Sequence, residues 1–121
     1  MDSTRFDDDP VQVYLREVGT FQLTKDQETE LSQHVLANDQ EAESAGKTLI
    51  EANLAMVVSL AKRYPRGNMH LLDLLQRGND GLFYALKTFR DHSDQSFSAY
   101  AATCADAAIA KAIADSNLLT D

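Results

Sequence analysis

Hydrophobic residues recur every three to four positions along most of the chain, the spacing that places them on one face of an α-helix. Only two prolines and five glycines interrupt the 121 residues, and no segment shows the strict alternation typical of a β-strand. The pattern therefore predicts an all-α fold. Its first helix is expected to be short, because Pro10 favours a first helical turn and Gly19 favours a helix end.

The next two helices are predicted from capping chemistry and from a broad apolar surface. Thr24 and Gln27 have the three-residue spacing of a capping box, so a second helix is expected to begin there and to close near Asn38. A third helix is expected from about residue 39 to residue 64. Its apolar residues spread too widely around the axis for one stripe, which favours a central position in the fold.

The C-terminal half is expected to contain three more helices. A short one spans about 70–77 and turns its leucines inward. Gly78 and Gly81 are then expected to flank a turn, since glycine weakens a helix, and another helix follows over about 82–89. A polar loop, 90–95, leads into the last helix.

The last helix and the net charge both argue against tight DNA binding by the chain alone. This helix, from about Ser96 to Asn117, contains nine alanines, which give strong helicity but little side-chain bulk. The chain has 19 acidic and 11 basic residues and a net charge of −8, the wrong sign for many phosphate contacts. An acidic surface suits a protein partner with a basic patch, although most such charge is simply a solvated surface.

The chain carries no signal for a membrane or for export. No apolar run approaches the roughly 18 residues needed to span a bilayer, and the acidic N-terminus lacks the features of a signal peptide. Cys104 is the single cysteine, which excludes an internal disulfide and fits a reducing compartment. We therefore expect a cytoplasmic protein.

No pattern of catalytic or metal-binding residues is evident. The three histidines lie far apart, and none has another ligand at metal-binding spacing, so neither a metal site nor a cofactor is expected. The chain also lacks a glycine-rich phosphate loop and a nucleophile elbow. Ser59 and Cys104 are better interpreted as packing residues than as nucleophiles. These observations predict that the protein is not an enzyme.

Four ordered stretches carry a family resemblance. They are DPVQVYLREVG at 9–19, LIEANLAMVVSLAKRY at 49–64, LDLLQRGNDGL at 72–82 and FSAYA at 97–101. In this order they resemble regions 1.2, 2.1 and 2.2 and the start of region 2.3 of the sigma-70 family of bacterial sigma factors. The resemblance implies a compact helical bundle like sigma domain 2, preceded by a helical region 1.2 segment, and a sigma-like protein that lacks domains 3 and 4.

The resemblance also implies how the chain is divided. Residues 1–8 are expected to be an acidic, disordered lead. Residues 9–38 are expected to form the helices of region 1.2, and residues 39–121 the region 2-like domain. The two parts are expected to pack as a single unit.

In the family, region 2.2 binds the clamp coiled coil of the largest subunit of RNA polymerase. The matching positions that the resemblance assigns to this contact are Asp73, Gln76, Arg77, Asn79 and Asp80. Arg77 stands where the family usually has Glu, and Asp80 stands where it usually has an aliphatic residue. A reversed charge in an interface costs on the order of 2 to 5 kcal/mol, so weakened binding is expected. An alternative is that Asp73 and Asn79 only cap two short helices.

Region 2.3 in the family melts the promoter by stacking aromatic side chains on unpaired bases. The resemblance assigns weak DNA contacts to Asn53, Met56, Phe97, Tyr100 and Lys111. An alternative for the two aromatic residues is that they pack on the apolar face of the last helix.

Several positions that would contact DNA depart from the family pattern. Gln95 replaces an aromatic residue, Asp106 an arginine and Ala107 a glutamine, while Thr103 and Cys104 replace two tryptophans. Losing two stacking tryptophans removes about 2 to 6 kcal/mol. Binding and melting of promoter DNA are therefore expected to be weak or to depend on a partner.

Two functions remain open at this stage. The first is a sigma-like initiation protein that binds core polymerase, alone or with a second sigma-like chain that supplies the promoter-reading domains. The alternative is a sigma mimic that binds an anti-sigma factor or another sigma regulator and has no DNA function. A degenerate structural remnant is a third, less favoured reading.

Overall fold

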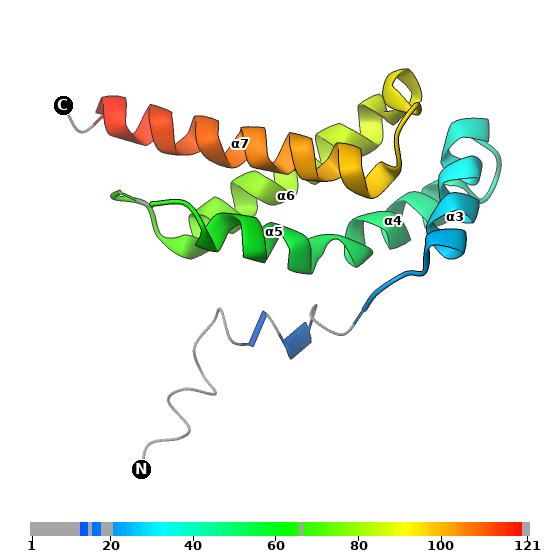
Figure 1. The fold of residues 1–121 in the computed structure, drawn as a ribbon, viewed down its shortest axis with the longest axis horizontal. Coiled ribbons are helices and arrows are strands. Elements are labelled where there is room, and N and C mark those ends of the chain that lie inside the picture. Colours follow the sequence, from blue (N-terminus) through cyan, green and yellow to red (C-terminus); the bar gives the residue numbers. More distant parts are fainter. Residues whose placement is uncertain (1–12, 15, 18–20, 66, 120–121) are drawn as a thin grey trace, which may run out of the picture.

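The computed structural model describes residues 13–14, 16–17, 21–65 and 67–119. Every regular element within these residues is a helix, which confirms the all-α prediction. The elements are α3 (Lys25–Ala37), α4 (Ala42–Ala52), α5 (Leu54–Lys62), α6 (Leu71–Thr88), a 3-10 turn, η1 (Phe89–His92), and α7 (Phe97–Leu119). Figure 1 shows α7 running alongside the α4–α5 pair, with α6 crossing obliquely behind them and α3 at one end.

The N-terminal segment is only partly described. Val13, Tyr14, Arg16 and Glu17 are helical, in agreement with the first predicted helix. The ends of that helix, at Pro10 and Gly19, lie outside the described residues, as does the acidic lead over 1–8.

Helix α3 begins and ends as its capping residues predict. The Gln27 backbone N–H donates to Thr24 Oγ1 at 3.1 Å, and the Thr24 N–H donates to Gln27 Oε1 at 2.9 Å, so both halves of the capping box form. Asn38 ends the helix in the left-handed conformation, with φ of 52°. Asparagine tolerates this region better than most residues, which explains the stop at this position.

The prediction of one helix over 39–64 is wrong, because two helices occupy this stretch. Helices α4 and α5 meet at Asn53, where φ is −110° and ψ is 4°. The Asn53 side-chain amide donates to the Leu49 carbonyl at 2.8 Å. Asparagine side chains compete in this way with helical backbone hydrogen bonds, which accounts for the break.

The predicted turn at Gly78 and Gly81 is also wrong, since α6 is a continuous helix through both residues. A Cβ atom at Gly78 would lie 2.5 Å from Val57 Cγ1, and one at Gly81 would lie 2.7 Å from the Cys104 carbonyl oxygen. The glycines therefore allow α6 to approach α5 and α7 closely, and do not end the helix.

The C-terminal elements follow the prediction with small shifts. The first part of the expected polar loop forms the turn η1, and the chain then continues into α7. The Ala99 N–H donates to Ser96 Oγ at 3.1 Å, so Ser96 caps the start of the last helix as its residue type favours. Leu72 is 38% exposed, which contradicts the expectation that all leucines of the 70–77 segment face inward.

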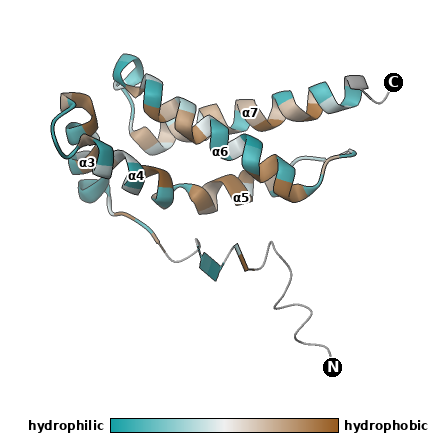
Figure 2. Ribbon diagram, turned by 180° about the vertical axis from the view of Figure 1, so that it is seen from behind, coloured by the Kyte–Doolittle hydropathy of each residue, from teal (hydrophilic) through white to brown (hydrophobic). Residues whose placement is uncertain are grey.

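The core lies where α4, α5, α6 and α7 meet. Its largest fully buried side chains are Leu49, Val57, Val58, Leu74, Leu82, Phe97 and Ile109. Figure 2 shows that α5 is hydrophobic over most of its length, which fits the predicted central position of this segment. Within the part of the chain that the structure describes, no helix has the length and apolarity to cross a bilayer.

Candidate protein-binding and nucleic-acid surfaces

Helix α6 presents one exposed face, which we call the α6 stripe. Its residues recur at three- and four-residue intervals on the side of the helix opposite the core. They are Leu72, Asp73, Gln76, Arg77, Asp80, Phe83, Tyr84 and Lys87. Phe83 is 56% exposed and Tyr84 59% exposed, so large hydrophobic groups lie between charged ones. The exposure of these two residues was not predicted from the sequence, because helical spacing alone does not show which neighbour covers each face.

Four of the five residues assigned to polymerase binding lie on the α6 stripe. The two that depart from the family pattern contact each other, with Arg77 Nη2 3.0 Å from Asp80 Oδ2. Both side chains remain more than half exposed, at 51% and 65%. An exposed pair of this kind adds at most about 1 kcal/mol to stability. Its consequence is electrostatic, since the acid at 80 balances the positive charge at 77.

Asn79, the fifth residue, faces away from the centre of this surface. Its side-chain N–H donates to Tyr14 Oη at 3.1 Å, which joins α6 to the N-terminal segment. Its Oδ1 is buried and has no hydrogen-bond partner among the described residues. The alternative of a capping role is wrong for Asn79, which lies in the middle of α6. Asp73 lies in the first turn of α6, where the negative charge of a carboxylate interacts favourably with the helix dipole.

Met56 and Asn53 differ in accessibility. The Asn53 residue is buried, 5% exposed, and its side-chain amide donates a hydrogen bond to the Leu49 carbonyl. Met56 is partly exposed and lines an open cavity of about 370 Å³, together with Phe21, Leu23, Glu28 and Ser98 among others. The structure thus leaves Met56, but not Asn53, at a surface that a ligand reaches.

Glu28 joins the second predicted helix to the start of the last one. Its carboxylate accepts hydrogen bonds from the Ser98 backbone N–H at 3.0 Å and from Ser98 Oγ at 2.7 Å. A negative charge is favourable at a helix N-terminus, where backbone N–H groups lack helical partners. This contact was not predicted from the sequence, because it spans 70 positions and leaves no local signal.

Phe97 and Tyr100 pack inside the bundle, 0% and 6% exposed. The Phe97 and Phe89 rings pack edge to face, with their centroids 5.4 Å apart. The Tyr100 ring stacks on the His92 ring, with their centroids 4.5 Å apart, and the Tyr100 hydroxyl forms a hydrogen bond with Thr88 Oγ1 at 2.6 Å. The alternative of packing on an apolar face therefore describes the observed positions. In this conformation neither ring is free to stack on a base, and a DNA contact would require these side chains to move.

The charged residues of α7 are engaged in internal contacts. Lys111 Nζ lies 2.8 Å from Asp115 Oδ2, and this hydrogen bond raises the pKa of Lys111. The Tyr64 hydroxyl donates to Asp106 Oδ1 at 2.6 Å, which raises the pKa of Tyr64. Asp106, the residue found where the family has an arginine, thus links the end of α5 to α7.

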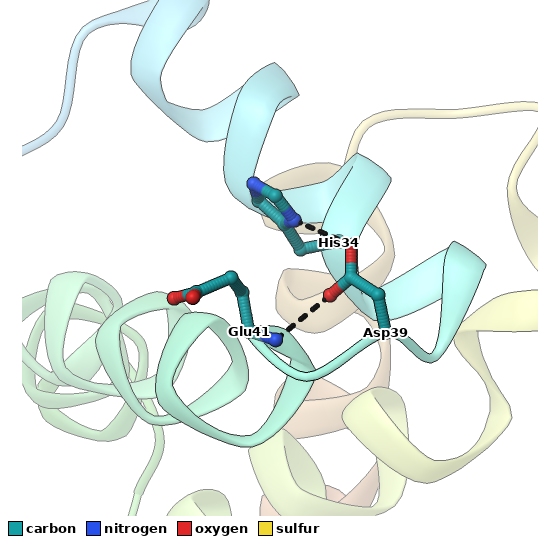
Figure 3. Close-up of polar contacts among 3 residues, drawn as sticks. All are labelled: His34, Asp39 and Glu41. Atoms are coloured by element: carbon teal, nitrogen blue, oxygen red, sulfur yellow. Dashed lines mark hydrogen bonds and ion pairs between the residues drawn. The ribbon is translucent and has the colours of Figure 1, made fainter.

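A further polar contact orients α3 on α4 (Figure 3). His34 Nδ1 lies 2.7 Å from Asp39 Oδ2, and the Glu41 N–H donates to Asp39 Oδ1 at 2.9 Å. The hydrogen bond to Asp39 raises the pKa of His34, and the same contact lowers the pKa of Asp39. Within the described residues no three His, Cys, Asp or Glu side chains are grouped as metal ligands would be.

Comparisons with known proteins agree with the order of the motifs. The family model for sigma-70 region 2 matches residues 49–118, and the model for sigma-70 factor region 1.2 matches residues 9–41. The RNA polymerase sigma factor SigA of Lactococcus lactis subsp. cremoris is 46% identical over 109 residues, which cover 89% of this chain and 30% of the relative.

Two further relatives carry the same name. The SigA protein of Clostridium acetobutylicum is 45% identical over 109 residues, 89% of this chain and 28% of its own length. The SigA protein of a Bacillus species is 44% identical over 108 residues, 88% of this chain and 28% of its own length. The chain spans less than a third of these relatives. The matched regions and their order show that the chain belongs to the sigma-70 family of RNA polymerase sigma factors.

Proposed function

We propose that this chain acts in bacterial transcription initiation by binding RNA polymerase core through the α6 stripe. The observation that carries the proposal is the stripe itself. On this exposed helix face, the polar residues predicted to bind polymerase lie beside the exposed apolar residues Leu72 and Phe83. Apolar anchors within a polar rim are typical of protein interfaces. The region that forms the stripe is matched by the sigma-70 region 2 model, and the relatives are named RNA polymerase sigma factors.

The Arg77–Asp80 pair supports retained rather than abolished binding. A partner that normally faces an acid at position 77 meets a positive charge, but Asp80 lies 3.0 Å from that charge and offsets it. We therefore expect polymerase binding to be weaker than in the family and not lost. Sigma factors are initiation factors and not enzymes, so membership of this family agrees with the prediction that the chain is not an enzyme.

Binding to promoter DNA is proposed to be weak or to depend on the polymerase complex. Phe97 and Tyr100 are buried, and Lys111 is paired with Asp115. The net charge of −8 disfavours approach to phosphate. A second sigma-like chain that supplies the remaining promoter contacts fits this picture. The chain described here is proposed to act in the cytoplasm, where bacterial transcription takes place.

The test is a titration of the purified chain against core polymerase, with and without Phe83→Ala. At low salt, where charge interactions are strongest, we expect the natural chain to bind and Phe83→Ala to weaken binding at least fivefold, because it removes an exposed apolar anchor. Gln22→Ala, an exposed polar residue outside the stripe, is the control. Failure of the natural chain to form a complex at micromolar concentration would refute the proposal.

A second candidate function is that of a sigma mimic that binds an anti-sigma factor or another sigma regulator. It is favoured by α7, in which alanine occupies four of the nine described exposed positions and the aromatic residues are buried, while the protein-binding face of α6 remains. In the same titration, binding to a purified anti-sigma factor but not to core polymerase would select this function.

A further inference from the structure

An apolar groove lies between α6 and α7, beside the α6 stripe. It is open to solvent and has a volume of about 380 Å³. Gly81 and Tyr84 line it from α6, and Thr103, Cys104, Ala107 and Lys111 line it from α7. Small side chains form most of α7's wall, and the half-exposed Tyr84 ring stands at the edge. The groove therefore has room for an apolar side chain supplied from outside.

The groove is continuous with the α6 stripe. Asp80 and Tyr84 belong to both, since each is exposed on α6 and each also lines the groove. A helix lying along the stripe would pass directly beside the opening. One partner can therefore cover the polar positions of α6 and place a side chain between the two helices.

Charge distinguishes among the possible occupants. Of the residues that line the groove, Lys111 is the only cation, and Asp115 holds it at 2.8 Å. Phosphate therefore gains little attraction here. A second copy of the chain is disfavoured because each copy carries a net charge of −8. A protein helix with an apolar anchor and flanking basic residues suits both the apolar lining and the acidic chain.

We propose that the α6–α7 groove receives an apolar side chain from a basic, helical segment of the same protein partner that covers the α6 stripe. The inference rests on the proposed function, in which that partner is core polymerase. It adds a second contact with the partner, in the groove between α6 and α7, to the contact on the exposed face of α6.

Cys104 provides a direct probe, because it is the single cysteine of the chain and lines the groove. The experiment measures the rate at which N-ethylmaleimide modifies Cys104, read by peptide mass spectrometry, in the free chain and in the presence of core polymerase. We expect polymerase to slow the modification at least fivefold. Protection by single-stranded DNA alone, or protection that grows with the concentration of the chain itself, would overturn the proposal.

Filling the groove gives the matched test. Ala107→Trp places a large side chain in it, whereas Ala110→Trp places the same side chain on an exposed part of α7 that does not line it. We expect Ala107→Trp to weaken polymerase binding at least tenfold and Ala110→Trp to change it less than twofold. If Ala107→Trp fails to fold by circular dichroism, Thr103→Trp replaces it, because Thr103 lines the groove and lies outside the α6 stripe, and at least fivefold weakening is expected.

The results separate the two proposals. If polymerase binds the natural chain, leaves Cys104 reactive and binds both tryptophan variants equally, the groove proposal fails and the proposed function stands. If polymerase does not bind the natural chain at all, both fail.

Discussion

Arg77 and Asp80 show how two departures from a family pattern offset each other at the scale of single residues. Each substitution alone alters the charge of the α6 stripe. In the structure they form an ion pair one helical turn apart, with a separation of 3.0 Å. Because both side chains are more than half exposed, the pair has little effect on stability and mainly determines the charge that a partner meets.

The contact between His34 and Asp39 predicts a pH dependence of stability. The pKa of His34 is raised above its ordinary 6.5, so its contribution is complete below pH 6.5 and is lost as the pH rises through the folded value. The pKa of Asp39 is lowered from 3.8, so its contribution is present above pH 3.8 and is lost as the pH falls through the folded value. The pair is therefore strongest between these two pH values.

The measurement is the melting temperature of the natural chain and of His34→Gln at pH 6.0 and pH 8.5. We expect the natural chain to melt higher than the variant at pH 6.0 and the difference to shrink at pH 8.5. The control is His70→Gln, which changes an exposed histidine at the N-cap of α6. An equal difference at both pH values would show that ionisation of His34 does not stabilise the fold.

Residue positions in a motif do not show which side chains are accessible. The sequence located Phe97, Tyr100 and Asn53 within the correct regions, and the structure places all three in the interior. Their burial depends on how η1 and α6 pack against α7 and on the break between α4 and α5. These are tertiary features that no local pattern contains.

At the scale of elements, α6 depends on two glycines within its length. Gly81 lies where α6 crosses α7, and an added Cβ atom would meet the backbone of Cys104 at 2.7 Å and of Ala105 at 2.8 Å. Backbone atoms yield only if the whole helix moves. The close packing of the two longest helices therefore requires glycine at this position.

Gly81→Ala is expected to lower the free energy of unfolding by about 1 to 3 kcal/mol, the usual cost of overpacking. Helix propensity alone would predict the opposite sign, a gain of about 1 kcal/mol. Urea denaturation measures the difference. Gly46→Ala is the control, because its added Cβ would meet the Leu86 side chain, which has more freedom to rotate away. A Gly81→Ala variant as stable as the natural chain would contradict this account of the crossing.

The elements that were predicted correctly have local causes. The capping box of Thr24 and Gln27, the left-handed Asn38 and the cap at Ser96 act within a few residues, so the sequence contains all the information they need. The turn expected at Gly78 and Gly81 was wrong for the opposite reason. Glycine there serves a contact with α5 and α7, which lie elsewhere in the chain.

At the scale of the whole molecule, the order of four motifs identified the family, whereas the groove between α6 and α7 was not predictable. The groove exists because Gly81, Thr103 and Ala107 come from two helices and leave space between them. Sequence spacing describes one helix at a time. It therefore predicts faces of a helix but not the cavities that two helices share.

The proposed loss of DNA contacts on α7 is testable by introducing the residues that the family pattern has at these positions. Thr103→Trp, Cys104→Trp and Asp106→Arg together replace the residues that depart from the family pattern. Two new stacking interactions, each worth about 1 to 3 kcal/mol, are expected to tighten binding to single-stranded minus-ten DNA at least tenfold. The added cation and the removed acid are expected to steepen the salt dependence.

A variant with leucine in place of each tryptophan and the same Asp106→Arg change is the control, since it has the same charge without the aromatic rings. Fluorescence anisotropy of a labelled oligonucleotide measures the DNA affinity of both variants. Equal affinities of the two variants would contradict the assignment of these positions to base stacking.

The hydrogen bonds between Glu28 and Ser98 have a consequence for the order in which the molecule assembles. They join residues 70 positions apart, so forming them closes a loop that includes most of the chain. Closing a long loop costs more chain entropy than making a local contact, and this cost is met once the helices inside the loop have packed. The contact between α3 and the start of α7 is therefore expected to form late, after the helices between them have packed.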